Sequence, residues 1–250
     1  MEEFDQQAAR WDQWAPHYDQ LATGRLPQRD AARLLELAPD GPALELGCGT
    51  GLVALELARL GADVTGLDAS PKMVAAFNTK AEAAGLPARA LLGDMTRIGL
   101  DRHFALVFVV ASTLFTLTTQ QGQVACFRAA AGHLRQGGVF IVEAEVPAWH
   151  PGARQAVSVH EVGDGHAQWS AMLHDPVTQV VRAQEIRADH NGARLLPLVT
   201  RYAWPGELDL MAQLAGMHLV LRHGDWEGGS FNAGSRRHLS VYTLDPSDDR

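Results

Sequence analysis

The chain has 250 residues, of which 46% are hydrophobic, so it is long enough for one sizeable core without a forced split into two domains. It carries 21 lysine and arginine residues against 29 aspartate and glutamate residues, a formal net charge of −8. This acidic balance disfavours a nucleic-acid partner, because enzymes that act on nucleic acids usually present a basic surface to the phosphates.

The lack of a secretory signal or membrane-spanning stretch and the placement of the cysteines indicate the same compartment. The N-terminus is acidic and has no apolar run behind basic residues, as a secretory signal would. The longest apolar stretch, residues 104–111, is far below the roughly 20 residues that a membrane span needs. Of the two cysteines, Cys48 lies inside a glycine loop, so we expect no structural disulfide with Cys126. We therefore expect a cytoplasmic protein that does not enter a membrane.

Short apolar runs alternate with helical patterns between residues 42 and 143, after an N-terminal segment, 1–40, that we expect to form a helical lid. This alternation is typical of a parallel sheet covered by helices on both faces. A glycine follows just after each predicted helix, where helices commonly end. The predicted strands are 42–46, 63–67, 88–92, 104–110 and 139–142, and the predicted helices are 52–60, 71–84 and 121–134.

Residues 148–203 do not follow this alternation of strands and helices, and their pattern predicts an antiparallel insertion. The strand-like segments are 168–174, 178–188 and 193–202, and Asn191-Gly192 is a strong hairpin signal between the last two. Four arginines spread through this region are typical of solvated faces: Arg182, Arg187, Arg194 and Arg201.

The alternation of helices and strands then continues, with a predicted helix over 207–215 and predicted strands over 217–221 and 238–244. We therefore predict a single α/β domain over residues 1–250. It contains a doubly wound, mostly parallel seven-stranded sheet, and the antiparallel insertion lies over the carboxyl edge of that sheet as a cap on the substrate.

A glycine-rich turn follows the first predicted strand, with Gly47, Gly49 and Gly51 at alternate positions before a helix. Glycine is needed where the chain turns sharply and brings its backbone against a ligand. The next strand ends in Asp68, about 20 residues beyond the turn, where a carboxylate can accept hydrogen bonds from ribose hydroxyls. Together these features indicate a site for a nucleoside.

The pattern Glu45-x-Gly47-x-Gly49-x-Gly51 resembles the first motif of class I S-adenosylmethionine-dependent methyltransferases. Asp68 and the segments 93–95 and 133–143 resemble the later motifs of that family in order and spacing. The likeness covers roughly residues 14–146 and 205–244. It implies a Rossmann-like fold, methyl transfer as the activity, S-adenosylmethionine as the cofactor and S-adenosylhomocysteine as the product.

The resemblance also implies which residues hold the cofactor. The glycine turn would contact the methionine portion, Asp68 the ribose, Ala69 the adenine face, and Asp94 with Met95 the adenine edge. Tyr18 matches an N-terminal tyrosine that often closes over the cofactor. The expected cofactor-binding residues are Tyr18, Gly47, Cys48, Gly49, Gly51, Asp68, Ala69, Met73, Gly93, Asp94, Met95 and Ala111.

Catalysis of methyl transfer depends mainly on orientation, because the acceptor lone pair must lie in line with the bond that breaks. A base is optional, since an amine need only arrive neutral, whereas a hydroxyl benefits from a base. His17 and Tyr18 flank the cofactor motif and His150 follows the fifth strand, so these three are the candidate catalytic residues. No residues show the spacing of metal ligands, and we expect no metal.

The acceptor is left open by the sequence. The insertion and the segments 112–115 and 198–205 are similar to small-molecule methyltransferases of bacterial secondary metabolism, including amino-sugar N-methyltransferases. We expect a small-molecule acceptor, methylated on nitrogen or oxygen. A homodimer through an exposed edge of the insertion is a further hypothesis.

Other functions remain as alternatives. An NAD-dependent dehydrogenase would want Gly-x-Gly-x-x-Gly, but Leu52 occupies the place of the third small residue. A tRNA or protein methyltransferase would need a basic groove in the structure. A non-catalytic binding module would have lost the glycines or the ribose acid, and both are intact.

Overall fold

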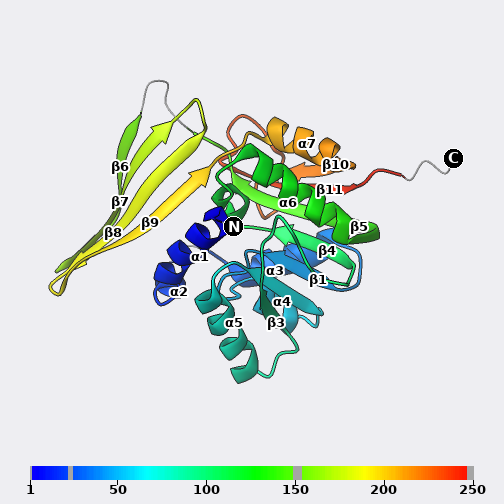
Figure 1. Cartoon of the computed structure of the whole chain (residues 1–250), viewed down its shortest axis with the longest axis horizontal. Helices are drawn as coiled ribbons and strands as arrows, with labels where there is room; N and C mark the ends of the chain where they lie inside the picture. The colour runs from blue at the N-terminus through cyan, green and yellow to red at the C-terminus, as the bar shows by residue number, and fades with distance from the viewer. Residues whose placement is uncertain (1, 22–24, 149–153, 247–250) are drawn as a thin grey trace.

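The computed structural model describes residues 2–21, 25–148 and 154–246. Its main sheet has seven strands in the order β10-β11-β5-β4-β1-β2-β3 (Figure 1). All neighbours are parallel except β11, which runs antiparallel to both β5 and β10. The mostly parallel seven-stranded prediction is thus confirmed. The strands are β1 (Ala43–Leu46), β2 (Val64–Asp68), β3 (Arg89–Leu92), β4 (Phe104–Val109), β5 (Leu134–Glu145), β10 (Met217–His223) and β11 (Arg237–Leu244).

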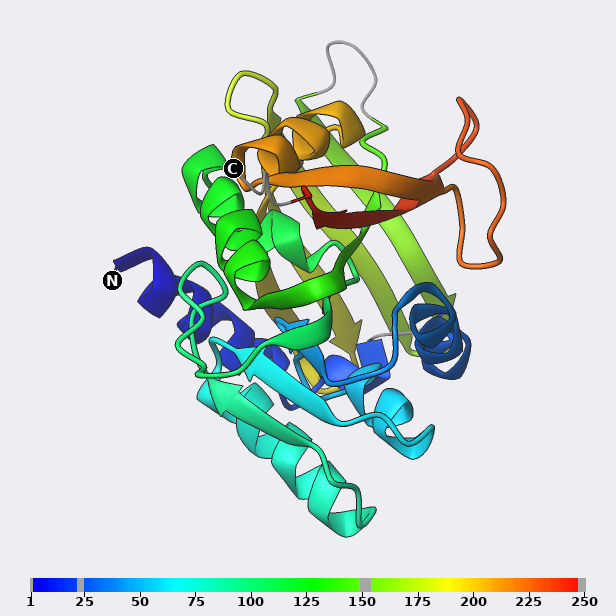
Figure 2. The same ribbon diagram turned by 90° about the vertical axis from the view of Figure 1, so that its right-hand side faces the viewer.

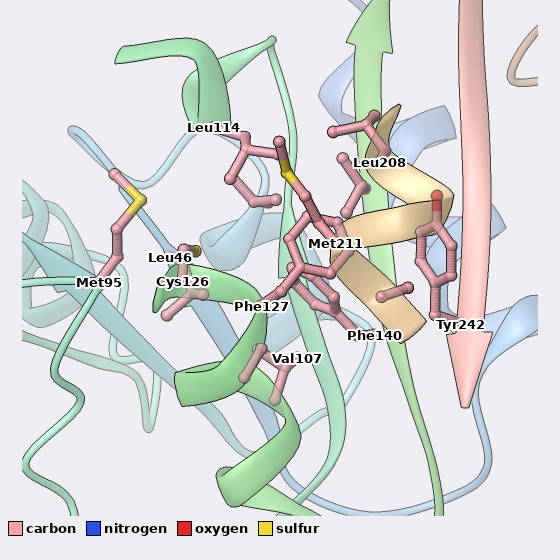
Figure 3. Packing of buried hydrophobic residues seen from close by; sticks show 14 of the residues in the cluster. Leu46, Met95, Val107, Leu114, Cys126, Phe127, Phe140, Leu208, Met211 and Tyr242 are labelled. Atoms are coloured by element: carbon pink, nitrogen blue, oxygen red, sulfur yellow. The ribbon is translucent and has the colours of Figure 1, made fainter. Parts of the chain in front are cut away.

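Helices cover both faces of this sheet, as the alternating pattern predicted. One buried cluster packs α3, α4 and α5 against one face. A second packs α6, α7 and the 3-10 helix η1 against the other, and Figure 3 shows residues of this second cluster. Burial of these apolar side chains is the main force that holds the layers together. The helices are α1 (Glu2–Trp14), α2 (Tyr18–Leu21), α3 (Pro27–Leu37), α4 (Ala54–Arg59), α5 (Pro71–Ala83), η1 (Thr113–Thr116), α6 (Gln120–His133) and α7 (Pro205–Leu214). No helix in the described ranges is long and apolar enough to cross a membrane.

The strand β5 is longer than the predicted 139–142 and begins directly where α6 ends. A β-carbon on Gly138 would lie 2.9 Å from the carbonyl oxygen of Phe104, so the backbones approach closely there. The register with β4 shifts between Phe104 and Leu106. Gly137 and Gly138, which follow the predicted helix 121–134, therefore lie inside an irregular start of the strand.

The insertion forms a separate four-stranded antiparallel sheet, in the order β6-β7-β8-β9. Figure 2 shows it behind the main sheet. Three of its strands match the predicted segments, and Asn191-Gly192 forms the predicted β8–β9 turn. The sequence reading missed β6, an edge strand whose side chains are mostly exposed and include valines, so that its pattern shows no clear alternation of polarity. The strands are β6 (Gln155–Gly163), β7 (His166–Asp175), β8 (Val180–Asp189) and β9 (Gly192–Arg201).

Arg201 joins the insertion to the main body, so the expectation of a solvated side chain was wrong at this position. It is 5% exposed at the end of β9. Its guanidinium donates to Gln123 of α6 at 2.6 Å, to Gln179 at 2.8 Å and to Glu207 of α7 at 2.6 Å. These charge-assisted hydrogen bonds fix where the second sheet leaves the body.

Replacing Arg201 with leucine is expected to lower the free energy of unfolding by about 3–5 kcal/mol, because it leaves the part-buried carboxylate of Glu207 without its partner. Urea denaturation measures the change. Arg182→Leu, at an exposed position of β8, is the matched control and should change the value by less than about 0.5 kcal/mol. Equal losses in the two variants would show that the network does not stabilise the fold.

Candidate active site

The glycine turn lies between β1 and α4 and has the backbone conformation that glycine permits. Gly47 has φ +66°, and a β-carbon there would lie 2.2 Å from Cγ2 of Thr113. Gly49 has φ +53°, and a β-carbon there would lie 3.3 Å from the ring of Tyr18. Both positions therefore need glycine, one for space and both for the left-handed backbone.

Asp68 at the end of β2 lies against this turn and is 8% exposed. Its Oδ2 accepts the backbone N–H of Gly49 at 2.8 Å, and its Oδ1 accepts that of Ser70 at 2.8 Å. Burial raises the pKa of the carboxyl, and the backbone hydrogen bonds oppose that shift. Each carboxylate oxygen keeps a further lone pair for a ligand hydroxyl.

Glu45 lies in the middle of β1, behind the turn, and is 4% exposed. Its Oε2 accepts the backbone N–H of Ala54 at 3.0 Å, which satisfies one donor of the first turn of α4. Burial raises the pKa of this carboxyl to about 8, while Arg25 acts in the opposite direction. A large share of Glu45 is therefore protonated at neutral pH.

The N-terminal helices are fastened across the turn by acidic side chains. Asp12 of α1 accepts the hydroxyl of Ser70 at 2.5 Å, just before α5. Asp19 of α2 accepts the hydroxyl of Thr50 at 2.5 Å and forms an ion pair with Lys80 at 2.5 Å. The start of the chain is thus held directly over the glycine turn.

Two further contacts hold α1 on its other sides. The amide of Gln7 donates to the carbonyl oxygen and the hydroxyl of Thr116, at 2.6 and 3.0 Å. The indole of Trp14 donates to the carbonyl oxygen of Pro197 in β9 at 2.9 Å. Helix α1 therefore bridges η1, the start of α5 and the insertion.

A cavity, here called the loop cavity, lies under α1 and α2 against the glycine turn. The ring of Tyr18 forms part of its wall, and burial raises the pKa of this phenol to about 12, so it stays protonated at neutral pH. The lining residues come from five separate stretches of the chain: Gln7, Trp11, Tyr18, Gly47, Gly49, Asp68, Ala69, Met73, Met95, Thr113 and Thr116.

A second cavity, the sheet cavity, has a volume of about 850 Å³ and lies between the insertion and the carboxyl end of β4. It shares Trp11, Tyr18, Thr113 and Thr116 with the loop cavity, so the two adjoin. One face of the insertion sheet supplies a wall, with Ala156, Ser158, Met172, Val181, Ala183, Leu198 and Thr200. The opposite wall contains Phe115 and Glu145.

The loop cavity brings together seven of the expected cofactor-binding residues: Tyr18, Gly47, Gly49, Asp68, Ala69, Met73 and Met95. The other five lie elsewhere. Cys48 is buried against Gly66, Gly51 faces a surface depression beside α4, and Ala111 lines the sheet cavity. Gly93 and Asp94 do not line the loop cavity, and Asp94 accepts the N–H and hydroxyl of Thr96.

The candidate catalytic residues are placed apart. Tyr18 lines both cavities. His17 lines neither and faces a third cavity, where its Nδ1 lies 3.3 Å from Arg194. His150 lies outside the described residues. The structure therefore brings only Tyr18 of the three to the junction of the cavities.

Sequence reasoning missed Gln7, Trp11, Thr113 and Thr116 as lining residues. Gln7 and Trp11 belong to a helix whose polar and apolar positions alternate as on any surface helix, so the sequence carries no signal of what that helix covers. Thr113 and Thr116 lie in a 3-10 helix that no periodicity predicts.

A strained turn follows β4 at the edge of the sheet cavity. Ala111 and Ser112 have φ +61° and +56°, values that side chains with a β-carbon rarely adopt. Glu143, 3% exposed, holds the turn by accepting the N–H of Ala111 at 2.6 Å. Arg237 at 3.2 Å and Arg25 at 3.7 Å face the same carboxylate. This arrangement presses Thr113 against the glycine turn.

Replacing Glu143 with alanine is expected to lower the free energy of unfolding by about 2–4 kcal/mol, since the strained N–H of Ala111 loses its acceptor. Glu143→Gln keeps one oxygen for that N–H and should lose roughly half as much. Urea denaturation of both variants measures the difference. Equal losses would mean that the ion pairs, and not the hydrogen bond to Ala111, hold the turn.

Comparison with known proteins gives consistent matches. A family model described as a methyltransferase domain matches residues 43–138. The structure of the CcbJ methyltransferase from Streptomyces caelestis is 37% identical, with a TM-score of 0.90, over 96% of this chain and 99% of that one. CalS10 from Micromonospora echinaspora, an amino pentose methyltransferase with S-adenosylmethionine bound, is 25% identical, with a TM-score of 0.67, over 88% of this chain and 92% of that one. The cypemycin N-terminal methyltransferase of a Streptomyces species is 27% identical over 79% of this chain and 81% of its own length.

These matches, together with the glycine turn and the sheet order, assign the chain to a family: it belongs to the class I S-adenosylmethionine-dependent methyltransferases. Neither the dehydrogenase nor the tRNA or protein methyltransferase alternative receives support. Within the described ranges, no three histidine, cysteine or acidic side chains are placed to hold a metal ion.

Proposed function

We propose that this enzyme methylates an amine nitrogen of a small molecule held in the sheet cavity. S-Adenosylmethionine supplies the methyl group from its sulfonium when it is bound. The residues of the loop cavity fit this cofactor: Gly47 and Gly49 leave room for a close backbone approach, and Asp68 offers carboxylate lone pairs to ribose hydroxyls. The ring of Tyr18 would close one side of the cofactor site.

The residues that line the sheet cavity favour a nitrogen over an oxygen as the methyl acceptor. Its described lining contains one carboxylate, Glu145, and four aromatic rings, those of Trp11, Tyr18, Phe115 and Tyr202, but no lysine, arginine or histidine. Aromatic faces and a carboxylate attract a cationic amine. A hydroxyl acceptor would benefit from a base, and the phenol of Tyr18, with a pKa of about 12, is protonated at neutral pH.

The residues of the chain would then act by orientation and exclusion of water. The phenol O–H of Tyr18 is placed to donate a hydrogen bond at the junction of the two cavities. Trp11 and Phe115 would keep solvent from the reacting nitrogen. The neutral fraction of the amine attacks, and the proton lost by the ammonium leaves to solvent before the attack.

The relatives support this choice by what they act on. CalS10 is an amino pentose methyltransferase of calicheamicin biosynthesis, and the cypemycin enzyme methylates an N-terminus. We infer from these names that the acceptor belongs to bacterial secondary metabolism, as an amino sugar or another amine-bearing metabolite.

A matched pair of acceptors tests the proposal. The purified enzyme is incubated with S-adenosylmethionine and an amino sugar, or with the same sugar carrying a hydroxyl in place of the amine, and products are followed by mass spectrometry. The amine should gain a methyl group at a rate that rises with pH as the amine loses its proton. Methylation of the hydroxyl sugar alone would overturn the choice of nitrogen.

The domain roles belong to the same proposal. We infer that residues 1–40 serve as a lid, because Asp12 and Asp19 fasten it across the glycine turn. Residues 148–203 would serve as the substrate cap. The formal charge of −8 supports a small-molecule acceptor over a nucleic acid, and the two free, buried cysteines fit a cytoplasmic protein.

We also infer a homodimer through the insertion. The strand β6 is an edge of its sheet; Val159 of β6 and Leu173 of the neighbouring strand β7 are 65% and 60% exposed. Such an edge favours pairing with a second copy. Light scattering should give the mass of a dimer for the wild type and of a monomer for Val159→Lys; a monomeric wild type would contradict the proposal.

A further inference from the structure

A third cavity, here called the basic cavity, lies between α2 and the β8–β9 hairpin and has a volume of about 440 Å³. Its lining includes His17, which directly precedes α2, and Arg187 and Arg194 of the hairpin. The chain as a whole carries a net charge of −8, so a cavity lined by two guanidiniums and an imidazole runs against the overall balance. Neither the cofactor nor the acceptor proposed above uses these groups.

The two arginines are brought together by the strand register. Arg187 of β8 is directly opposite Arg194 of β9 in the antiparallel ladder. Like charges in this position repel each other unless an anion lies between them. Asp189 is the acidic group of the lining. Its carboxylate accepts the N–H of Asn191 and attracts Arg187 electrostatically, but within the described ranges it forms a salt bridge with neither guanidinium.

His17 completes the cluster from the opposite wall. The Nη1 of Arg194 lies 3.3 Å from Nδ1 of His17. When the guanidinium donates to Nδ1, the neutral ring keeps its proton on Nε2 and offers a second donor. Burial, Arg194 and Arg187 all lower the pKa of His17, which is the direction expected beside two cations.

The basic cavity continues the inner face of the insertion sheet. Along β8, Val181 and Ala183 line the sheet cavity, and Arg187, an even number of residues further on, projects from the same face. Along β9, Leu198 lines the sheet cavity and Arg194 lies four residues before it. The inner face therefore changes from apolar to basic, with α2 between the two cavities.

We propose that the basic cavity is a binding site for a phosphate group. Two guanidiniums matched to a dianion favour phosphate over a single carboxylate, because a planar guanidinium can donate two parallel hydrogen bonds to phosphate oxygens. The imidazole of His17 supplies a further donor, and it can gain a proton once the anion offsets the two arginines. This inference does not depend on the proposed methylation.

Calorimetric titration of the full chain with inorganic phosphate, in a phosphate-free buffer and without cofactor, tests the site. Saturable 1:1 binding is expected. Arg187→Gln and Arg194→Gln should each weaken it at least about tenfold, and Arg187→Lys should weaken it less. Arg182→Gln, on the opposite face of the same strand, is the matched control and should leave the affinity unchanged. Thermal melting shows that each variant is folded.

A second arm distinguishes a free ion from a phosphate carried by a larger molecule. Titration with a sugar 1-phosphate should give tighter binding than inorganic phosphate if the site takes a phosphomonoester, and no tighter binding if it takes the free ion; both results support the site. NMR should show the pKa of His17 rising when phosphate is added, because the anion offsets Arg187 and Arg194, which lower that pKa. Asp189, the acidic group of the lining, is present with and without phosphate. Absence of saturable binding to the wild type, or an equal loss in Arg182→Gln, would overturn the proposal.

Discussion

Replacing Asp68 with asparagine is expected to weaken the binding of S-adenosylhomocysteine by at least about 100-fold. The carboxylate lies at the end of β2 beside the glycine turn, where it can accept two ribose hydroxyls. Each charge-assisted hydrogen bond contributes about 1.5–3 kcal/mol. Asparagine keeps the shape of the side chain, but one of its two oxygen acceptors becomes an NH2 donor. That donor must face either the N–H of Gly49 or the ribose, and the hydrogen bond at that position is lost.

Asp63→Asn provides the control for this measurement. Asp63 lies just before β2, at the other edge of the sheet, where it is exposed and pairs with Arg102. The affinity of this variant should equal that of the wild type, and both variants should unfold cooperatively. An unchanged calorimetric affinity for S-adenosylhomocysteine in Asp68→Asn would defeat the assignment of the ribose acid.

The stability of the fold is expected to depend on pH through the buried carboxyl of Glu45. Its pKa is about 8 in the folded protein, above its ordinary value of 4.5, because burial disfavours the charge. Between these two pH values the folded chain holds a proton that the unfolded chain has released. The free energy of unfolding therefore falls as pH rises through this window, by an amount on the order of 3–5 kcal/mol from this group.

The variant Glu45→Gln isolates this contribution, since glutamine stays neutral and still offers an oxygen to the N–H of Ala54. Urea denaturation at several pH values between 4.5 and 8.5 should show wild type and variant with different slopes. The variant should gain stability relative to the wild type as pH rises. Asp68 and Glu143, whose pKa values are also raised by burial, are common to both proteins and cancel in the difference. Parallel curves would show that Glu45 is ionised throughout.

The main sheet could be predicted from the sequence because each of its strands leaves a strong local signal. Buried parallel strands read as apolar runs, and glycines just past the helices mark where those helices end. The irregular start of β5 and the edge strand β6 could not be predicted in this way. The first depends on close backbone contact between Gly138 and Phe104, and the second has mostly exposed side chains without a clear alternation of polarity.

The residues of the site also fall into those that a local sequence signal predicts and those that it does not. Gly47, Gly49, Asp68 and Ala69 follow strand ends, and the topology of a parallel sheet brings strand ends together at one edge. Residues such as Gln7 and Trp11 reach the loop cavity through tertiary contacts of α1, which no local pattern records. Arg201 shows the converse, because an arginine that the sequence assigns to solvent is buried by three partners from distant segments.

Isothermal titration of the purified protein with S-adenosylhomocysteine, with NAD as a parallel control, tests directly whether the glycine turn and Asp68 form a methyltransferase cofactor site. One site with a dissociation constant on the order of micromolar or tighter is expected for S-adenosylhomocysteine, and no binding is expected for NAD. Binding of NAD without binding of S-adenosylhomocysteine would contradict the assignment of the glycine turn and of Asp68 to a methyltransferase site.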